Sequence, residues 1–71
     1  MSKKILIFGK QGWPYTDRAR SAFGGDAEYI DVVANPDRLD EMLSYSKGKR
    51  KVPVVVEGDK VTIGYGGSWG I

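Results

Sequence analysis

The chain has 71 residues, and its 11 lysines and arginines against 9 acidic residues give a formal net charge of +2. This length predicts a single domain over residues 1–71, and the mild charge disfavours a nucleic-acid partner. The sequence contains no cysteine and no histidine, which excludes disulfides, zinc sites and thiol chemistry by the chain as written. The apolar runs are too short to cross a bilayer or to form a signal peptide, so we expect a cytoplasmic protein without a membrane partner.

The first predicted elements are a strand, a loop and a helix. The unbroken apolar run 5–8 predicts a strand over roughly residues 3–8 that is buried on both faces. Pro14 is typical of the first position of a helix, and the pair Gly24-Gly25 predicts its end near Phe23. Helical spacing predicts the buried face of this helix, which consists of Tyr15, Ala19, Ala22 and Phe23.

A second strand and a second helix follow. Residues 28–33 are rich in apolar side chains and predict a strand parallel to the first, because the intervening helix makes a right-handed crossover. Asn35 is predicted to cap a helix that has Pro36 in its first turn and extends to about Ser46. Residues 47–48 are predicted to end it. Its buried face is predicted to consist of Leu39, Met42 and Leu43.

The last third of the chain begins with a basic run and continues with a hairpin. Four of the five residues 47–51 are cations, which is typical of a solvated loop. A nucleic-acid site is the alternative, but no aromatic residues are interleaved for base stacking. Residues 54–57 and 60–63 predict two antiparallel strands joined by the two-residue turn Gly58-Asp59. The resulting order of elements is strand, helix, strand, helix, strand, strand.

The loop 9–13 joins the first strand to the first helix. The first N–H groups of a helix have no intrahelical partner and carry partial positive charge, so this position favours an anion or a thiolate. The residue there is Trp13, whose indole is neither. The pattern therefore predicts a reactive site that lacks its reactive atom.

The segment Lys10-x-x-Trp13-Pro14-Tyr15-Thr16 resembles the Lys-x-x-Cys-Pro-Tyr-Cys loop of glutaredoxins. Val52-Pro53, where glutaredoxins carry a cis proline, and Gly64, Gly66 and Gly67 beyond the hairpin follow in the family's order. The resemblance implies an α/β, thioredoxin-like fold of the glutaredoxin type. Its four-stranded mixed sheet has the order 2-1-3-4, and its elements follow the order β-α-β-α-β-β. The usual C-terminal helix is expected to be lacking, because the sequence stops at Ile71, where that helix would begin.

Without a third helix, the sheet face under the first helix is expected to carry apolar surface with little cover. That surface would be exposed, covered by Tyr65 and Trp69, or used in a dimer. We therefore expect a monomer or a weak dimer.

The resemblance also implies roles for individual residues. Trp13 stands at the position of the nucleophilic cysteine and Thr16 at that of the resolving cysteine. Glutathione would be the co-substrate, protein–glutathione mixed disulfides would be the partners, and no metal is implied. The residues implied to bind glutathione are Lys10 at its glycine carboxylate, Tyr15 in the groove, Val52 through its backbone ahead of a cis Pro53, and Gly67 and Ser68 at its γ-glutamyl end. Lys10 is equally compatible with a solvated loop lysine.

Two functions from different classes remain open. In the first, the chain is a glutaredoxin-like thiol or selenol oxidoreductase whose nucleophile is absent from this version of the chain. In the second, it is a redox-inactive module that binds glutathione or an extended peptide beside Pro53. The intact segment Pro14-Tyr15-Thr16 favours the first, because a decayed site would more often lose its surroundings too.

The two tryptophans of the chain, Trp13 and Trp69, suggest a substitution. The tryptophan codon UGG differs by one base from both cysteine codons and from UGA, which encodes selenocysteine in some redox proteins. We therefore hypothesise that residue 13 is selenocysteine or cysteine in the native protein, and that Trp69 marks a second reactive position beside the same groove.

Overall fold

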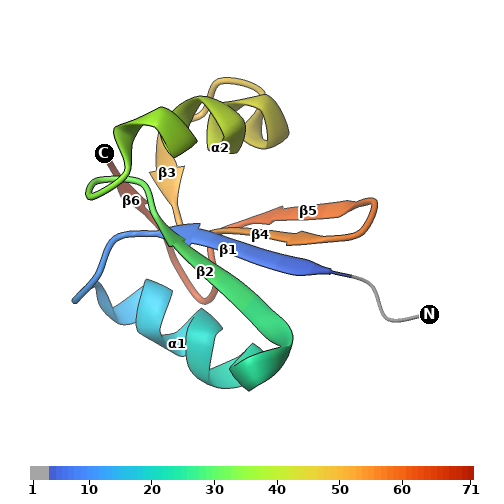
Figure 1. Cartoon of the computed structure of the whole chain (residues 1–71). Helices are drawn as coiled ribbons and strands as arrows, with labels where there is room; N and C mark the ends of the chain where they lie inside the picture. The colour runs from blue at the N-terminus through green and yellow to red at the C-terminus, as the bar shows by residue number, and fades with distance from the viewer. Residues whose placement is uncertain (1–3) are drawn as a thin grey trace.

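The structure, a computed structural model, describes residues 4–71 and places a sheet between two helices (Figure 1). The elements are β1 (Ile5–Gly9), α1 (Pro14–Phe23), η1 (Gly24–Asp26), β2 (Ala27–Asp31), η2 (Pro36–Arg38), α2 (Leu39–Ser46), β3 (Lys51–Val52), β4 (Val54–Glu57), β5 (Lys60–Ile63) and β6 (Trp69–Gly70), of which η1 and η2 are single 3₁₀ turns. The main sheet has the order β2-β1-β4-β5. Its strands β1 and β2 are parallel and the other neighbours antiparallel, which confirms the predicted thioredoxin-like sheet. Neither α1 nor α2, the α-helices of the described residues, is long and apolar enough to span a membrane.

Most element boundaries agree with the sequence. The predicted bounds of α1, β4 and β5 are confirmed. Lys3, the first residue of the predicted first strand, lies outside the described residues. β2 ends at Asp31, earlier than predicted, because the N–H of Asn35 donates to the carbonyl of Asp31 (2.9 Å) and closes a turn over residues 32–34. The two-stranded sheet of β3 and β6 was not predicted, because two-residue strands carry no periodic signal.

Asn35 occupies the predicted N-cap position directly before Pro36, but its side chain makes no capping hydrogen bond. The side-chain amide of Asn35 donates to the carbonyl of Asp31 (3.0 Å), so it secures the turn after β2 instead of capping a helix. Residues 36–38 form a 3₁₀ turn, and α2 begins only at Leu39. The helix ends at Ser46 as predicted.

β1 lies at the centre of the sheet and separates two clusters of buried side chains, as predicted for a strand buried on both faces. The cluster on the α2 side consists of Leu6, Phe8, Ile30, Val32, Met42, Val52, Val54 and Val56. The cluster on the α1 side consists of Ile7, Ala19 and Val55. Burying a side chain of the size of Phe8 contributes about 1.5–3 kcal/mol, so the α2 side supplies most of the hydrophobic stabilisation.

The predicted buried face of α1 is only partly right. Ala19 is fully buried, and Tyr15 and Phe23 are half-buried, but Ala22 is exposed. Thr16, which was not predicted to face the sheet, is fully buried. The helix is therefore rotated so that its inner face runs through Thr16 and Ala19.

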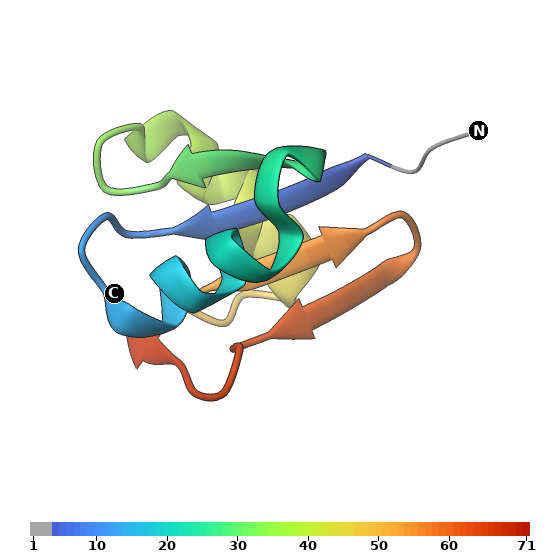
Figure 2. The same cartoon turned by 90° about the horizontal axis from the view of Figure 1, so that it is seen from below.

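The α1 side of the sheet needs less cover than expected. Thr62 of β5 pairs with Val55 of the α1-side cluster, so Thr62 and Lys60 are the residues that β5 contributes to this face. Figure 2 shows α1 crossing the sheet and leaving β5 at its edge. Tyr65 packs against Phe23 with ring centroids 6.0 Å apart, whereas Trp69 packs against Trp13 and Tyr15, so only the Tyr65 part of the expected cover is seen. Beyond α1, this face of the sheet therefore carries polar side chains of β5 and the contact between Tyr65 and Phe23.

Candidate functional site

Trp13 lies between β1 and α1, at the N-cap of the helix that Pro14 begins. Its backbone is extended, with φ −89° and ψ 130°. Its carbonyl accepts a hydrogen bond from the N–H of Asp17 (3.0 Å), and its own N–H donates to the carbonyl of Lys10 (3.3 Å). Residue 13 thus occupies the predicted position, at which the free N–H groups of a helix favour negative charge.

The side chain of Trp13 packs against Trp69 from the other end of the chain. Their ring centroids are 4.9 Å apart and the ring planes meet at 86°, an edge-to-face arrangement. Tyr15 also approaches Trp69, with 6.4 Å between ring centroids. We call Trp13, Tyr15 and Trp69 the aromatic cluster. A shallow hollow of about 190 Å³ opens beside it, lined by Gly12, Trp13, Pro14 and Trp69. The fold thus brings the two tryptophans side by side.

Lys10 places a positive charge on the aromatic cluster. Its Nζ lies over the ring of Trp13, 4.7 Å from the ring centroid. Such a cation–π contact contributes about 0.5–1 kcal/mol at an exposed site. The ammonium group is therefore directed at residue 13, while its contact with a glutathione carboxylate stays a prediction.

Thr16, at the position of the resolving cysteine, is inaccessible to solvent. Its side chain packs against Gly9 at the end of β1, where an added Cβ would lie only 2.5 Å from Cγ2 of Thr16. The hydroxyl of Thr16 accepts a hydrogen bond from the N–H of Lys10 (3.5 Å). Thr16 therefore holds the site loop on the sheet.

The peptide bond between Val52 and Pro53 is cis, which confirms the prediction made from the resemblance. Both residues are buried. Val52 belongs to the cluster on the α2 side of the sheet, against which Trp13 also packs. The cis bond therefore lies near the predicted redox position.

The edge of β3 is covered by the chain's own C-terminal segment. β3 and β6 pair in antiparallel orientation, with Val52 opposite Trp69. The N–H of Ile71 donates to the carbonyl of Arg50 (3.0 Å), and Nε of Arg50 donates to the carbonyl of Ile71 (3.1 Å). β6 therefore occupies the backbone edge at which Val52 was predicted to hold glutathione. Sequence reasoning missed this pairing.

Gly67 and Ser68 lie in the segment that leads from β5 to β6. Gly67 crosses the face of Tyr15 so closely that an added Cβ would lie 2.5 Å from Cζ of the ring. The carbonyl of Gly67 accepts a hydrogen bond from the N–H of Tyr65 (2.9 Å), and Ser68 is exposed. Gly67 thus has a packing role here, and the predicted contacts of both residues with glutathione stay predictions.

Asp31, which sequence reasoning missed, fixes the site loop from the end of β2. Its carboxylate accepts hydrogen bonds from the N–H groups of Gln11 (3.2 Å), Val33 (2.9 Å) and Ala34 (3.0 Å). Burial opposes ionisation of Asp31, but the N–H groups of Ala34, Gln11 and Val33 outweigh it and lower its pKa. An acid at the end of a strand, next to a turn, was the available signal.

We expect Asp31→Asn to destabilise the fold by about 1 kcal/mol at neutral pH, because the amide accepts these hydrogen bonds less strongly than a carboxylate. The lowered pKa fixes the sign of the pH dependence: the contribution of Asp31 is present above its ordinary pKa and is lost as the pH falls through the folded-state pKa. Urea unfolding between about pH 7 and pH 2 measures the difference, which should shrink in acid. Asp26→Asn is the control, and an equal effect of both substitutions would contradict the role of Asp31.

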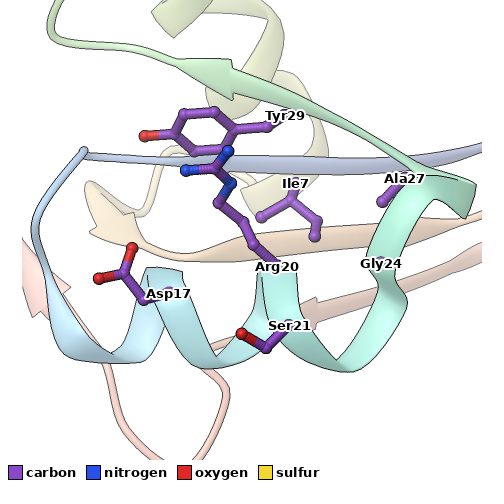
Figure 3. A pocket seen from close by; sticks show the side chains of 7 residues that line it. All are labelled: Ile7, Asp17, Arg20, Ser21, Gly24, Ala27 and Tyr29. Carbon is purple, nitrogen blue, oxygen red and sulfur yellow. The ribbon is translucent and has the colours of Figure 1, made fainter.

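A second hollow, of about 370 Å³, lies between α1 and β2 (Figure 3). The guanidinium carbon of Arg20 lies 4.1 Å from the ring centroid of Tyr29. Burial raises the pKa of Tyr29 to about 12, assisted by the carboxylate of Asp31, so the phenol is neutral at pH 7. Asp17 lines the same hollow, and its carboxylate points away from the guanidinium group of Arg20. The charge of Arg20 at this hollow is therefore stacked on the Tyr29 ring. Residues 4–71 contain no group of three or more acidic side chains that could hold a metal ion.

Comparison with known proteins supports the resemblance. The family model described as Glutaredoxin matches residues 5–62, which is more than half of the chain. No curated protein and no solved structure matches the chain. The matched range contains the loop around Trp13 and the pair Val52-Pro53, whereas Gly67, Ser68 and Trp69 lie beyond it.

Proposed function

The chain belongs to the glutaredoxin family, and on this basis we propose that residue 13 is the redox position of a glutaredoxin-like thiol or selenol–disulfide oxidoreductase. We propose that the chain as written is inactive, because Trp13 stands where the nucleophile belongs. Glutathione is the proposed co-substrate and protein–glutathione mixed disulfides are the proposed substrates. A cytoplasmic location fits this proposal, because glutathione keeps thiols reduced there.

The observation that carries the proposal is the position of Trp13 at the N-cap of α1, with Nζ of Lys10 over its ring. The free N–H groups of the helix and the ammonium group both favour a negative charge at residue 13. A cysteine or selenocysteine there would be held as the thiolate or selenolate, which is the nucleophilic form.

The proposed reaction needs only that nucleophile and glutathione. The thiolate or selenolate attacks the glutathione sulfur of a mixed disulfide, so the old S–S bond breaks and the protein thiol leaves as a thiolate that takes up a proton. A second glutathione thiolate then attacks the bound glutathione, releases glutathione disulfide and restores the nucleophile. The indole of Trp13 has no ionisable proton in the useful range and no free lone pair, so it performs neither step.

The contact between Trp13 and Trp69 supports the hypothesis that both positions are reactive in the native protein. Their rings meet at 4.9 Å, although the two residues lie near opposite ends of the chain. In the alternative, Trp13 is native and packs against Trp69 as part of the aromatic cluster. The native gene distinguishes the two cases: UGA or a cysteine codon at position 13 supports the proposal, UGG at position 13 contradicts it, and codon 69 tests the second position separately.

One observation favours the second function, a redox-inactive module that binds an extended peptide. The edge of β3 already accepts an antiparallel strand, because Val52 pairs with Trp69 of β6. Because β6 pairs with β3 through only two residue pairs, an extended peptide can displace β6 and pair with β3 in its place. In this alternative Trp13 is native and its ring forms part of the peptide groove.

We expect glutathione to bind this chain weakly or not at all. The indole of Trp13 is far larger than a thiol and occupies the volume in which the glutathione sulfur would lie, and β6 covers the backbone of Val52. Chemical-shift titration with reduced glutathione measures this, with the α-linked peptide Glu-Ala-Gly as control. Saturable shifts at Lys10, Val52 and Gly67 with micromolar glutathione, and none with the control peptide, would contradict the expectation.

A further inference from the structure

The outer side of β5 is an open edge of the main sheet, since no strand within residues 4–71 pairs with it (Figures 1 and 2). The N–H of Gly64 donates to the carbonyl of Pro53 (2.7 Å) and continues the ladder between β4 and β5. Hydrogen-bonded and non-bonded pairs alternate in such a ladder, so the N–H and C=O groups of Val61 and Ile63 point outward. The edge therefore offers two residues with free backbone donors and acceptors.

A hollow lies beside this edge on the α2 side of the sheet. Val61 and Ile63 pair with Val56 and Val54, which belong to the cluster on the α2 side of the sheet. The side chains of Val61 and Ile63 therefore point to the same side. The hollow has a volume of about 360 Å³ and is lined by Tyr45, Ser46, Lys47, Lys49, Asp59, Val61 and Ile63. Val61 is 38% exposed, so an incoming side chain can reach an apolar floor.

Lys47 and Lys49, from the basic run 47–51, line the hollow and lie in a segment whose backbone is fixed by hydrogen bonds. Lys47 has a left-handed backbone with φ 59°, and the N–H of Gly48 donates to the carbonyl of Leu43 (2.9 Å). The buried hydroxyl of Ser46 donates to the carbonyl of Lys49 (2.8 Å). Both lysines line the hollow, and Asp59 is the one acidic side chain in its lining.

We propose that the edge of β5 and this hollow form a docking site for an extended acidic peptide segment, which adds to the sheet as a fifth strand. The peptide backbone pairs with the outward groups of Val61 and Ile63. Its alternate side chains lie over the hollow, where an apolar one contacts Val61 and acidic ones face Lys47 and Lys49. A nucleic acid would leave the outward N–H and C=O groups without strand partners. The site is separate from residue 13 and does not depend on the redox proposal.

The test is a chemical-shift titration of the ¹⁵N-labelled chain with the capped octapeptide Glu-Thr-Val-Thr-Glu-Thr-Val-Thr, which places glutamate and valine on the same face of an extended strand. We expect saturable shifts at Val61, Ile63, Lys47 and Lys49. The double substitution Lys47→Glu with Lys49→Glu should weaken binding by roughly tenfold or more. Lys51→Glu is the matched control, because Lys51 belongs to the same basic run but does not line the hollow, and it should change binding far less.

A second peptide keeps the test independent of changes to the protein. The same octapeptide, N-methylated at alternate residues along its hydrogen-bonding edge, keeps its charge but cannot pair as a strand, and it should bind at least roughly tenfold more weakly. The proposal is overturned if the shifts centre on Trp13 and Val52, if both peptides bind equally, or if the Lys51 control loses as much affinity as the double variant. Equal binding of an oligothymidylate at the same residues would overturn it in favour of a polyanion surface.

Discussion

Trp13→Cys is expected to give the chain glutathione-dependent reduction of a mixed disulfide, at a rate roughly a hundredfold or more above the background measured with the parent chain. The new thiol would lie at the N-cap of α1 and take the place of the indole under Nζ of Lys10. Both features lower the pKa of a thiol and raise its thiolate fraction at neutral pH. The measurement is turnover of a glutathione mixed disulfide with glutathione as the reductant.

Two controls separate the effect of position from that of merely adding a thiol. Trp13→Ser removes the same ring contacts without adding a thiol, so its turnover of the mixed disulfide should stay at background. Ala22→Cys places a thiol on the exposed side of the same helix, away from its N-terminus, and should alkylate with an ordinary thiol pKa while adding little turnover. If folded Trp13→Cys is as slow as Ala22→Cys, residue 13 is not the redox position.

The sheet and α1 were predictable because their signals are local. The apolar run 5–8 needed no knowledge of distant residues, and neither did Pro14 or the turn Gly58-Asp59. The rotation of α1 was not predictable in the same way. Whether Ala22 or Thr16 faces the sheet depends on the close approach of Thr16 to Gly9, which is a tertiary contact.

For the candidate site too, the features with a local signal were predictable and those that depend on tertiary contacts were not. Pro14 gave the position of Trp13 at the start of the helix, and the resemblance gave the cis bond before Pro53. It did not give the role of Asp31, whose bond to the N–H of Gln11 joins segments far apart in sequence. The resemblance also did not give the pairing of β6 with β3, because a strand of two residues is too short to show an alternating pattern in the sequence.

The remaining prediction concerns the contact between Trp13 and Trp69. The double substitution Trp13→Cys with Trp69→Cys is expected to form an intramolecular disulfide on mild oxidation, because the two rings are in contact and their removal lets β6 move toward residue 13. The short ladder of β6 against β3 lets the backbone adjust to disulfide geometry. Loss of both titratable thiols in a chain that remains monomeric on a non-reducing gel is the measurement.

This cross-link should also raise stability substantially, because it would close a loop over most of the chain. Loop-closure entropy for a segment of that length corresponds to about 4 kcal/mol, which urea unfolding with and without a reductant measures. The control pair Ala22→Cys with Trp69→Cys keeps one partner but moves the other two turns along α1, and it should retain free thiols. Free thiols in the Trp13 pair as well, or cross-linking only between molecules, would show that positions 13 and 69 do not act together and would leave position 13 without its proposed second reactive residue.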